Sequence, residues 1–198
     1  MFTVTNTSGL TSDPATVSIS VSTVTASVTQ TSVNWGTVGT APLSTALDGL
    51  RLLPAGRSTD LPWLNINQFV ITLSQAEPLS PADVLVTGMT VANYGPITVS
   101  GGNTQYVITL ALPIANADRV TLTIGNANIA TYTRRLDVVP GDFTDDGQVN
   151  SADILGVNRL IGAAPNVFAD IDGNGTTDSN DVQWVRKKVG TRLPPLAP

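Results

Sequence analysis

Apolar and polar side chains alternate in short runs from about residue 26 to residue 139. The runs are 25–35, 66–74, 83–94, 96–100, 104–112, 119–125 and 130–139. Gly, Pro, Asn and Asp lie between them and mark turns. Many short strands spaced in this way are typical of a β-sandwich. We therefore predict that residues 26–139 form one β-sandwich domain.

The N-terminal residues show the same alternation. Residues 2–7 and 16–24 read as strands, and Ser8-Gly9 and Asp13-Pro14 mark turns between them. Two strands alone cannot bury a core. The stretch FTVTNTSGLTSDPATVSISV resembles the closing hairpin of a bacterial immunoglobulin-like or cadherin-like repeat. Residues 1–25 are therefore expected to be the closing strands of such a preceding repeat, or the N-terminal strands of the following domain.

After Pro140 the pattern changes to an internal repeat. An offset of 28 residues superimposes the segment that begins at Asp142 on the one that begins at Asp170. In each copy, an acidic loop is followed by apolar positions spaced as on one face of a helix. These positions are Ile154, Val157, Leu160 and Ile161 in the first copy, and Val182, Val185 and Val189 in the second. Gly162 and Gly190 are expected to end the two helices.

Each acidic loop has the spacing of a calcium-binding loop. Side-chain oxygens recur at the first, third, fifth, ninth and twelfth places, and Gly occupies the sixth, where such a loop turns sharply. We expect two Ca²⁺ ions, one per loop. Thr144 stands where Asp or Asn is usual, so the first site should be the weaker. The predicted ligands are Asp142, Thr144, Asp146, the Gln148 carbonyl, Asn150 and Asp153, and then Asp170, Asp172, Asn174, the Thr176 carbonyl, Asp178 through water, and Asp181.

The amino-acid composition excludes several classes of function. Eight of the fifteen acidic residues lie between 142 and 181, and a cluster of this density needs a cation. Four of the ten basic residues follow closely, too few and too near the acidic cluster to form a nucleic-acid surface. The chain has no Cys and no His, which excludes thiolate and imidazole metal sites and a His-based triad. We predict no nucleic-acid binding.

No apolar run is long enough to insert into a membrane. The opening MFTVTNTSGL has neither a basic start nor a continuous apolar stretch, so it does not read as an export signal. We expect the chain to be a fragment whose export signal lies upstream or is not included.

The C-terminal repeat resembles a type I dockerin over residues 140–193, with 194–198 as a tail. Both loops end in Asp, and neither has a full helix in front, unlike calmodulin-like proteins. The resemblance implies an antiparallel pair of calcium loop-helix repeats that binds a cohesin-like protein domain. It also implies which residues face that partner: Ser151, Ala152, Asn158 and Arg159, with Ser179, Asn180, Arg186 and Lys187 in the second repeat.

The region 26–139 resembles an immunoglobulin-like module found before dockerins in surface proteins of planctomycete-type bacteria. The phrases that carry this resemblance are LPWLNINQFVITLS, ADVLVTGMTVANYG and LDVVPGD. The expected protein is mainly β with a small α module at its C-terminus. It is expected to be extracellular or at the cell surface, without catalytic residues, and to serve attachment in cell adhesion or polysaccharide breakdown.

Two other functions remain open. One is that the chain is a fragment of a larger glycoside hydrolase. Outside the calcium region it has only Glu77 and six scattered Asp, so catalysis would require upstream sequence. Alternatively, the sandwich binds carbohydrate by stacking sugars on Trp35, Trp63 or Tyr94. Aromatic side chains in such domains are more often part of the core.

Overall fold

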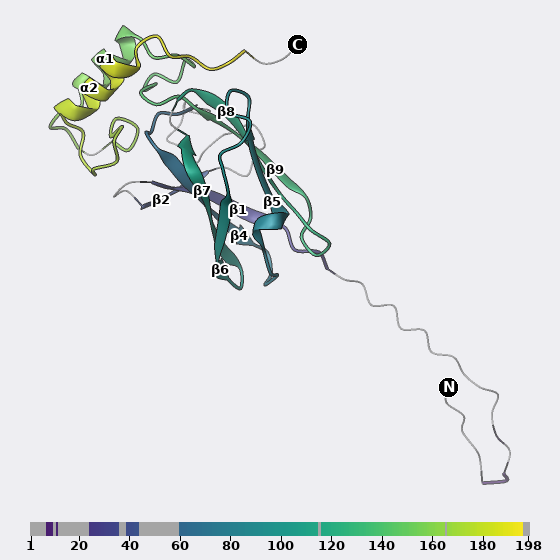
Figure 1. Cartoon of the computed structure of the whole chain (residues 1–198). Coiled ribbons are helices and arrows are strands. Elements are labelled where there is room, and N and C mark those ends of the chain that lie inside the picture. The colour runs from purple at the N-terminus through teal and green to yellow at the C-terminus, as the bar shows by residue number, and fades with distance from the viewer. Residues whose placement is uncertain are drawn as a thin grey trace.

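The computed structural model describes residues 7–9, 11, 24–35, 39–43, 60–114, 116–164 and 166–195. The strands predicted at 2–7 and 16–24 fall almost entirely outside these residues. The described chain is mainly β, with two short helices near its C-terminus (Figure 1). No helix in these ranges combines the length and apolar character needed to cross a membrane.

The strands form two sheets. In the five-stranded sheet the order is β2 (Gly39–Leu43), β1 (Val28–Trp35), β4 (Ile66–Leu73), β7 (Gln105–Ile114) and β6 (Ile97–Gly102). In the four-stranded sheet it is β3 (Asp60–Leu61), β9 (Tyr132–Val138), β8 (Asp118–Ile124) and β5 (Val84–Gly88). A short 3₁₀ helix, η2 (Pro81–Asp83), leads into β5. Neighbouring strands are antiparallel except β3 and β9, which are parallel. We call β1 to β9 the two-sheet unit.

Both sheets contribute to one buried cluster. Phe69 and Ile71 of β4 belong to it, as do Val120 and Leu122 of β8, and all four are fully buried. Residues two apart on a strand share a face, so the alternating pattern of the sequence becomes one apolar face per sheet. Each such buried side chain contributes about 1.5–3 kcal/mol of hydrophobic stabilisation.

Each of the seven predicted runs overlaps a strand, but β2 and β3 were not predicted. The run 83–94 also ends early, because β5 stops at Gly88. There the Gly88 N–H donates to the carbonyl of Val91 at 3.0 Å. The buried Asp118 carboxylate accepts hydrogen bonds from the N–H groups of Thr90 and Val91. A distant acceptor therefore stabilises a turn that the local alternation does not predict.

Helices α1 (Ser151–Asn158) and α2 (Ser179–Lys188) lie side by side at one end of the sheets (Figure 1). Val157, Val182 and Val185 bury their side chains in a second cluster between them. Ile161 and Val189 were predicted on the same face, but they are 43% and 51% exposed. That prediction is wrong because both residues lie beyond the ends of their helices.

The glycines expected to end the helices adopt left-handed backbone angles. Gly190 directly follows Val189, the C-cap of α2, and has a φ of 89°, as predicted. Gly162 has a φ of 73°, but α1 already ends at Asn158 with Arg159 as its C-cap, so the prediction that Gly162 ends this helix is wrong. This conformation is costly for residues with a Cβ and terminates helices.

Candidate metal centres and partner surface

The first acidic loop brings three carboxylates together. One oxygen each of Asp142, Asp146 and Asp153 lies within 4.8 Å of the others, and Asp142 and Asp153 are buried. The Gly147 N–H donates to Asp142 at 2.8 Å. Asp153 accepts from the N–H and the hydroxyl of Thr144 at 2.7 and 2.8 Å. The loop backbone therefore wraps around its own carboxylates and fixes their positions.

The second loop repeats this geometry. Asp170, Asp172 and Asp181 each place one oxygen within 4.8 Å of the others. Asp170 accepts from the Gly175 N–H at 2.9 Å, and Asp181 accepts from the Ile171 N–H at 2.7 Å. Asp170 and Asp181 are buried. The carboxylates at the first and twelfth places correspond between the two loops, whereas the third carboxylate comes from the fifth place in the first loop and from the third place in the second.

The other predicted ligands belong to the hydrogen-bond networks of the same loops. At the ninth place, Asn150 and Asp178 are the N-caps of α1 and α2, accepting from the second N–H of each helix. Asn174 accepts from the N–H and hydroxyl of Thr176, and the Gln148 N–H donates to Asp146. The ninth residue therefore joins the loop to its helix and lies outside the three-carboxylate group.

Two places in each loop adopt the left-handed conformation. At the sixth place, Gly147 and Gly175 have φ values of 81° and 91°. At the fourth place, Gly173 has a φ of 77° in the second loop, whereas Asp145 has a φ of 66° in the first. A residue with a Cβ is less stable there than glycine. The first loop therefore stores backbone strain that the second avoids, which the spacing of oxygen ligands did not reveal.

Three of the loop carboxylates, those of Asp142, Asp170 and Asp172, have a raised pKa in the absence of a cation. Burial raises the pKa of Asp142 to about 6, and the nearby charge of Asp153 adds to this, while N–H donors such as that of Gly147 oppose it. Burial also raises the pKa of Asp170 and of Asp172, with a further contribution from the charge of Asp181. A bound cation would remove this penalty. Oxygen-only clusters of this kind suit a hard cation such as Ca²⁺.

The eight residues predicted to face a partner are all exposed. They lie on α1 and α2 or directly after α1, and are Ser151, Ala152, Asn158, Arg159, Ser179, Asn180, Arg186 and Lys187. Between them on α1 lies Leu155, which is 49% exposed. On α2, the Lys187 ammonium lies over the half-buried Trp184 ring at 4.3 Å from its centroid. The two helices therefore present different chemistry, because α1 exposes the apolar Leu155 among small and polar side chains and α2 exposes a basic pair.

The three aromatic residues proposed as a sugar-stacking platform lie in the core. Trp35, Trp63 and Tyr94 are 5%, 1% and 3% exposed. Rings buried to this degree offer no face to a sugar. The carbohydrate-binding alternative therefore loses the residues on which it was based.

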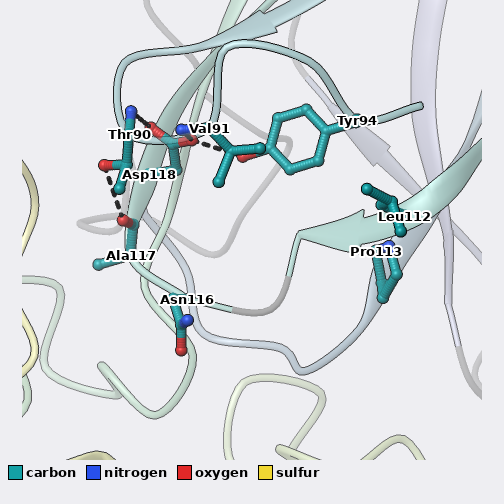
Figure 2. Close-up of a pocket in the computed structure, with 8 residues that line it drawn as sticks. All are labelled: Thr90, Val91, Tyr94, Leu112, Pro113, Asn116, Ala117 and Asp118. Atoms are coloured by element: carbon teal, nitrogen blue, oxygen red, sulfur yellow. Dashed lines mark hydrogen bonds between the residues drawn. The ribbon is translucent and has the colours of Figure 1, made fainter.

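A pocket of about 340 Å³ that sequence reasoning missed lies beside β8 (Figure 2). Its apolar walls include Val91, Leu112 and Pro113. At its polar edge, Tyr94 donates its hydroxyl to Asp118. Because the Asp118 carboxylate also accepts from the turn described above, it serves to hold that turn.

Comparison with known proteins supports the metal-binding interpretation. Residues 140–190 match the family model described as the dockerin type I domain, which supports a dockerin module in this stretch. Dockerin domains are non-catalytic, bind calcium and attach to cohesin domains, and they occur in extracellular or cell-surface proteins. No curated protein and no solved structure matches the chain.

Proposed function

We propose that this chain is a calcium-dependent attachment protein whose C-terminal module docks a cohesin-like domain. The observation that carries the proposal is the pair of matching three-carboxylate clusters inside the dockerin segment. Each cluster binds one Ca²⁺ ion, so the module holds two. No residue of this chain is assigned a catalytic role.

The three carboxylates of each cluster supply the central ligands of its ion. They occupy the first, fifth and twelfth places of the first loop and the first, third and twelfth places of the second. The remaining oxygens come from the other predicted ligands of each loop, including the carbonyls of Gln148 and Thr176 and, through water, Asp178. The twelfth residue also accepts hydrogen bonds from its own loop, as Asp153 does from Thr144. Calcium binding therefore fixes the start of each helix relative to its loop.

The partner surface consists of the eight exposed residues named above. Arg186 and Lys187 suit an acidic patch on the partner, and this attraction speeds and orients docking. Ala152 and Leu155 suit an apolar patch next to it. Because the two helices differ in chemistry, the partner is expected to bind preferentially in one orientation.

The two-sheet unit serves as an immunoglobulin-like spacer between the dockerin module and the remainder of the parent protein. We propose the divisions 1–25, 26–139, 140–193 and 194–198. The parent protein is secreted or displayed at the cell surface, and the attachment serves adhesion or a polysaccharide-degrading system. The single core shared by the two sheets supports the spacer role, since one packed core gives a stiff element.

The test is capture of purified type I cohesin domains by the full chain in calcium and in excess EDTA. Calcium-dependent capture by any member of the panel supports the proposal. A charge-reversal pair, Arg186→Glu with Lys187→Glu, should weaken capture at least tenfold. Arg192→Glu is the control, because it removes an exposed positive charge beyond α2. Absence of calcium binding by calorimetry would refute the proposed function.

A further inference from the structure

A short segment of the two-sheet unit contacts the entrances of both calcium loops. This segment, Leu61–Leu64, runs from β3 toward β4, and we call it the bridging segment. The Val139 N–H donates to the Leu61 carbonyl at 3.0 Å, and the Gly141 N–H donates to the Pro62 carbonyl at 2.8 Å. Gly141 directly precedes Asp142, so the first loop begins at a backbone hydrogen bond to this segment.

The other half of the bridging segment contacts the second loop and the residues just before it. The indole N–H of Trp63 donates to the Val167 carbonyl at 2.7 Å, and the Leu64 N–H donates to the Ile171 carbonyl at 3.0 Å. Ile171 is the second residue of the loop, and its own N–H donates to Asp181. Ile171 therefore donates its N–H to a carboxylate of the second cluster and accepts a hydrogen bond from the bridging segment at its carbonyl.

The bridging segment is itself firmly packed. The Trp63 ring stacks on Trp35 at 4.8 Å and on Phe168 at 5.9 Å between centroids. All three rings are at most 5% exposed. The indole N–H of Trp35 donates to the Leu64 carbonyl at 2.8 Å. Because Phe168 lies just before the second loop, the stack continues the core of the two-sheet unit to that loop.

We propose that Leu61–Leu64 positions both calcium loops, so that calcium binding and the packing of the two-sheet unit stabilise each other. This inference rests on the calcium binding proposed above. Without calcium, the crowded carboxylates of the second loop repel one another and favour an open loop. Opening breaks the contacts of Ile171 and Val167 with the bridging segment. Calcium closes the loop and restores them, and thermodynamic linkage makes the effect reciprocal.

Trp63→Phe in the full chain tests this coupling. The substitution keeps an aromatic ring in the stack and removes the indole N–H that reaches Val167. One buried hydrogen bond corresponds to about a fivefold change in an equilibrium constant. Calorimetric titration should therefore show calcium affinity about fivefold weaker, chiefly at the second loop.

Tyr106→Phe is the matched control. Its hydroxyl donates to the Glu77 carbonyl at 2.8 Å, so this variant also removes a bond from a largely buried aromatic ring to a backbone carbonyl, but within the two-sheet unit. Its calcium affinity should equal that of the unmodified chain. Equal affinities for all three proteins, or equal weakening in both variants, would overturn the coupling.

Hydrogen exchange on the unmodified chain gives a test that does not depend on a variant folding. The Leu64 amide should exchange at least tenfold more slowly with calcium than without, because its partner Ile171 lies in the loop that calcium closes. Calcium-independent exchange at Leu64, in a chain that binds calcium, would overturn the coupling while leaving the attachment function intact. A chain that binds no calcium would refute the attachment function itself.

Discussion

At Gly156 in α1, two physical effects predict opposite changes in protein stability on substitution by alanine. Glycine inside a helix is less stable than alanine by about 1 kcal/mol, so helix propensity predicts that Gly156→Ala stabilises the protein. The structure predicts the reverse. A Cβ at Gly156 would lie 2.4 Å from Cδ1 and 2.7 Å from Cε1 of Phe143.

The magnitude follows from the packing of Phe143. Ordinary contact begins at 3.4 Å, so the ring would have to retreat by about 1 Å. Phe143 packs against both apolar clusters, and moving it would disturb each of them. Overpacking of this kind costs about 1–3 kcal/mol, which exceeds the gain in propensity. The net expectation is a loss of about 1 kcal/mol, or a Tm lower by about 3 °C.

Differential scanning calorimetry in saturating calcium measures this shift. Gly102→Ala is the control, because its Cβ would meet nothing within 4 Å, and its Tm should stay level or rise slightly. Phe143→Ile, which copies the residue at the corresponding place of the second repeat, should remove the penalty in the double variant. A higher Tm for Gly156→Ala alone would show that Phe143 does not pack against α1 as described.

Three further predictions concern the calcium loops. Thr144→Asp should raise calcium affinity at the first site severalfold in calorimetric titration, because it supplies the carboxylate that Asp172 supplies in the second loop. Asp145→Gly should stabilise the calcium-bound chain by about 1 kcal/mol in denaturant titration, since it relieves the left-handed strain that Gly173 avoids; an unchanged midpoint would contradict this. The pKa of Asp142 is raised to about 6 from 3.8, so its contribution to the stability of the calcium-free fold is complete below pH 3.8 and is lost as the pH rises through 6. Calcium affinity at the first site should rise as the pH increases through 6, because Asp142 then loses its proton. An affinity that stays constant between pH 5 and pH 7 would refute Asp142 as a calcium ligand.

The two carboxylate clusters were largely predictable because their parts lie close together in the chain. Asp142, Asp146 and Asp153 fall within twelve residues, and so do Asp170 and Asp181. In such a loop, the spacing of oxygen side chains and one obligatory turn glycine leave few other conformations. The strand pattern was readable for the same reason, since alternation along one strand reports which of its faces is buried.

Other features depended on partners far away in sequence. The strand expected to continue past Gly88 ends there because Asp118, 28 residues from Thr90, accepts the hydrogen bonds of the turn. The strained fourth place of the first loop, Asp145, became visible only from its backbone angle. The helical spacing of apolar residues likewise continues in the sequence to Ile161, although α1 ends three residues earlier, at Asn158.

The sequence by itself determined the two acidic loops, the helices behind them and most of the strands, because each depends on residues near one another along the chain. Only the tertiary structure decided that Leu61–Leu64 lies against both loops, 70 or more residues away from Val139 and 100 or more from Val167 and Ile171. Contacts of that range depend on how the sheets pack and on which aromatic side chains share the core. No local pattern of residues encodes them.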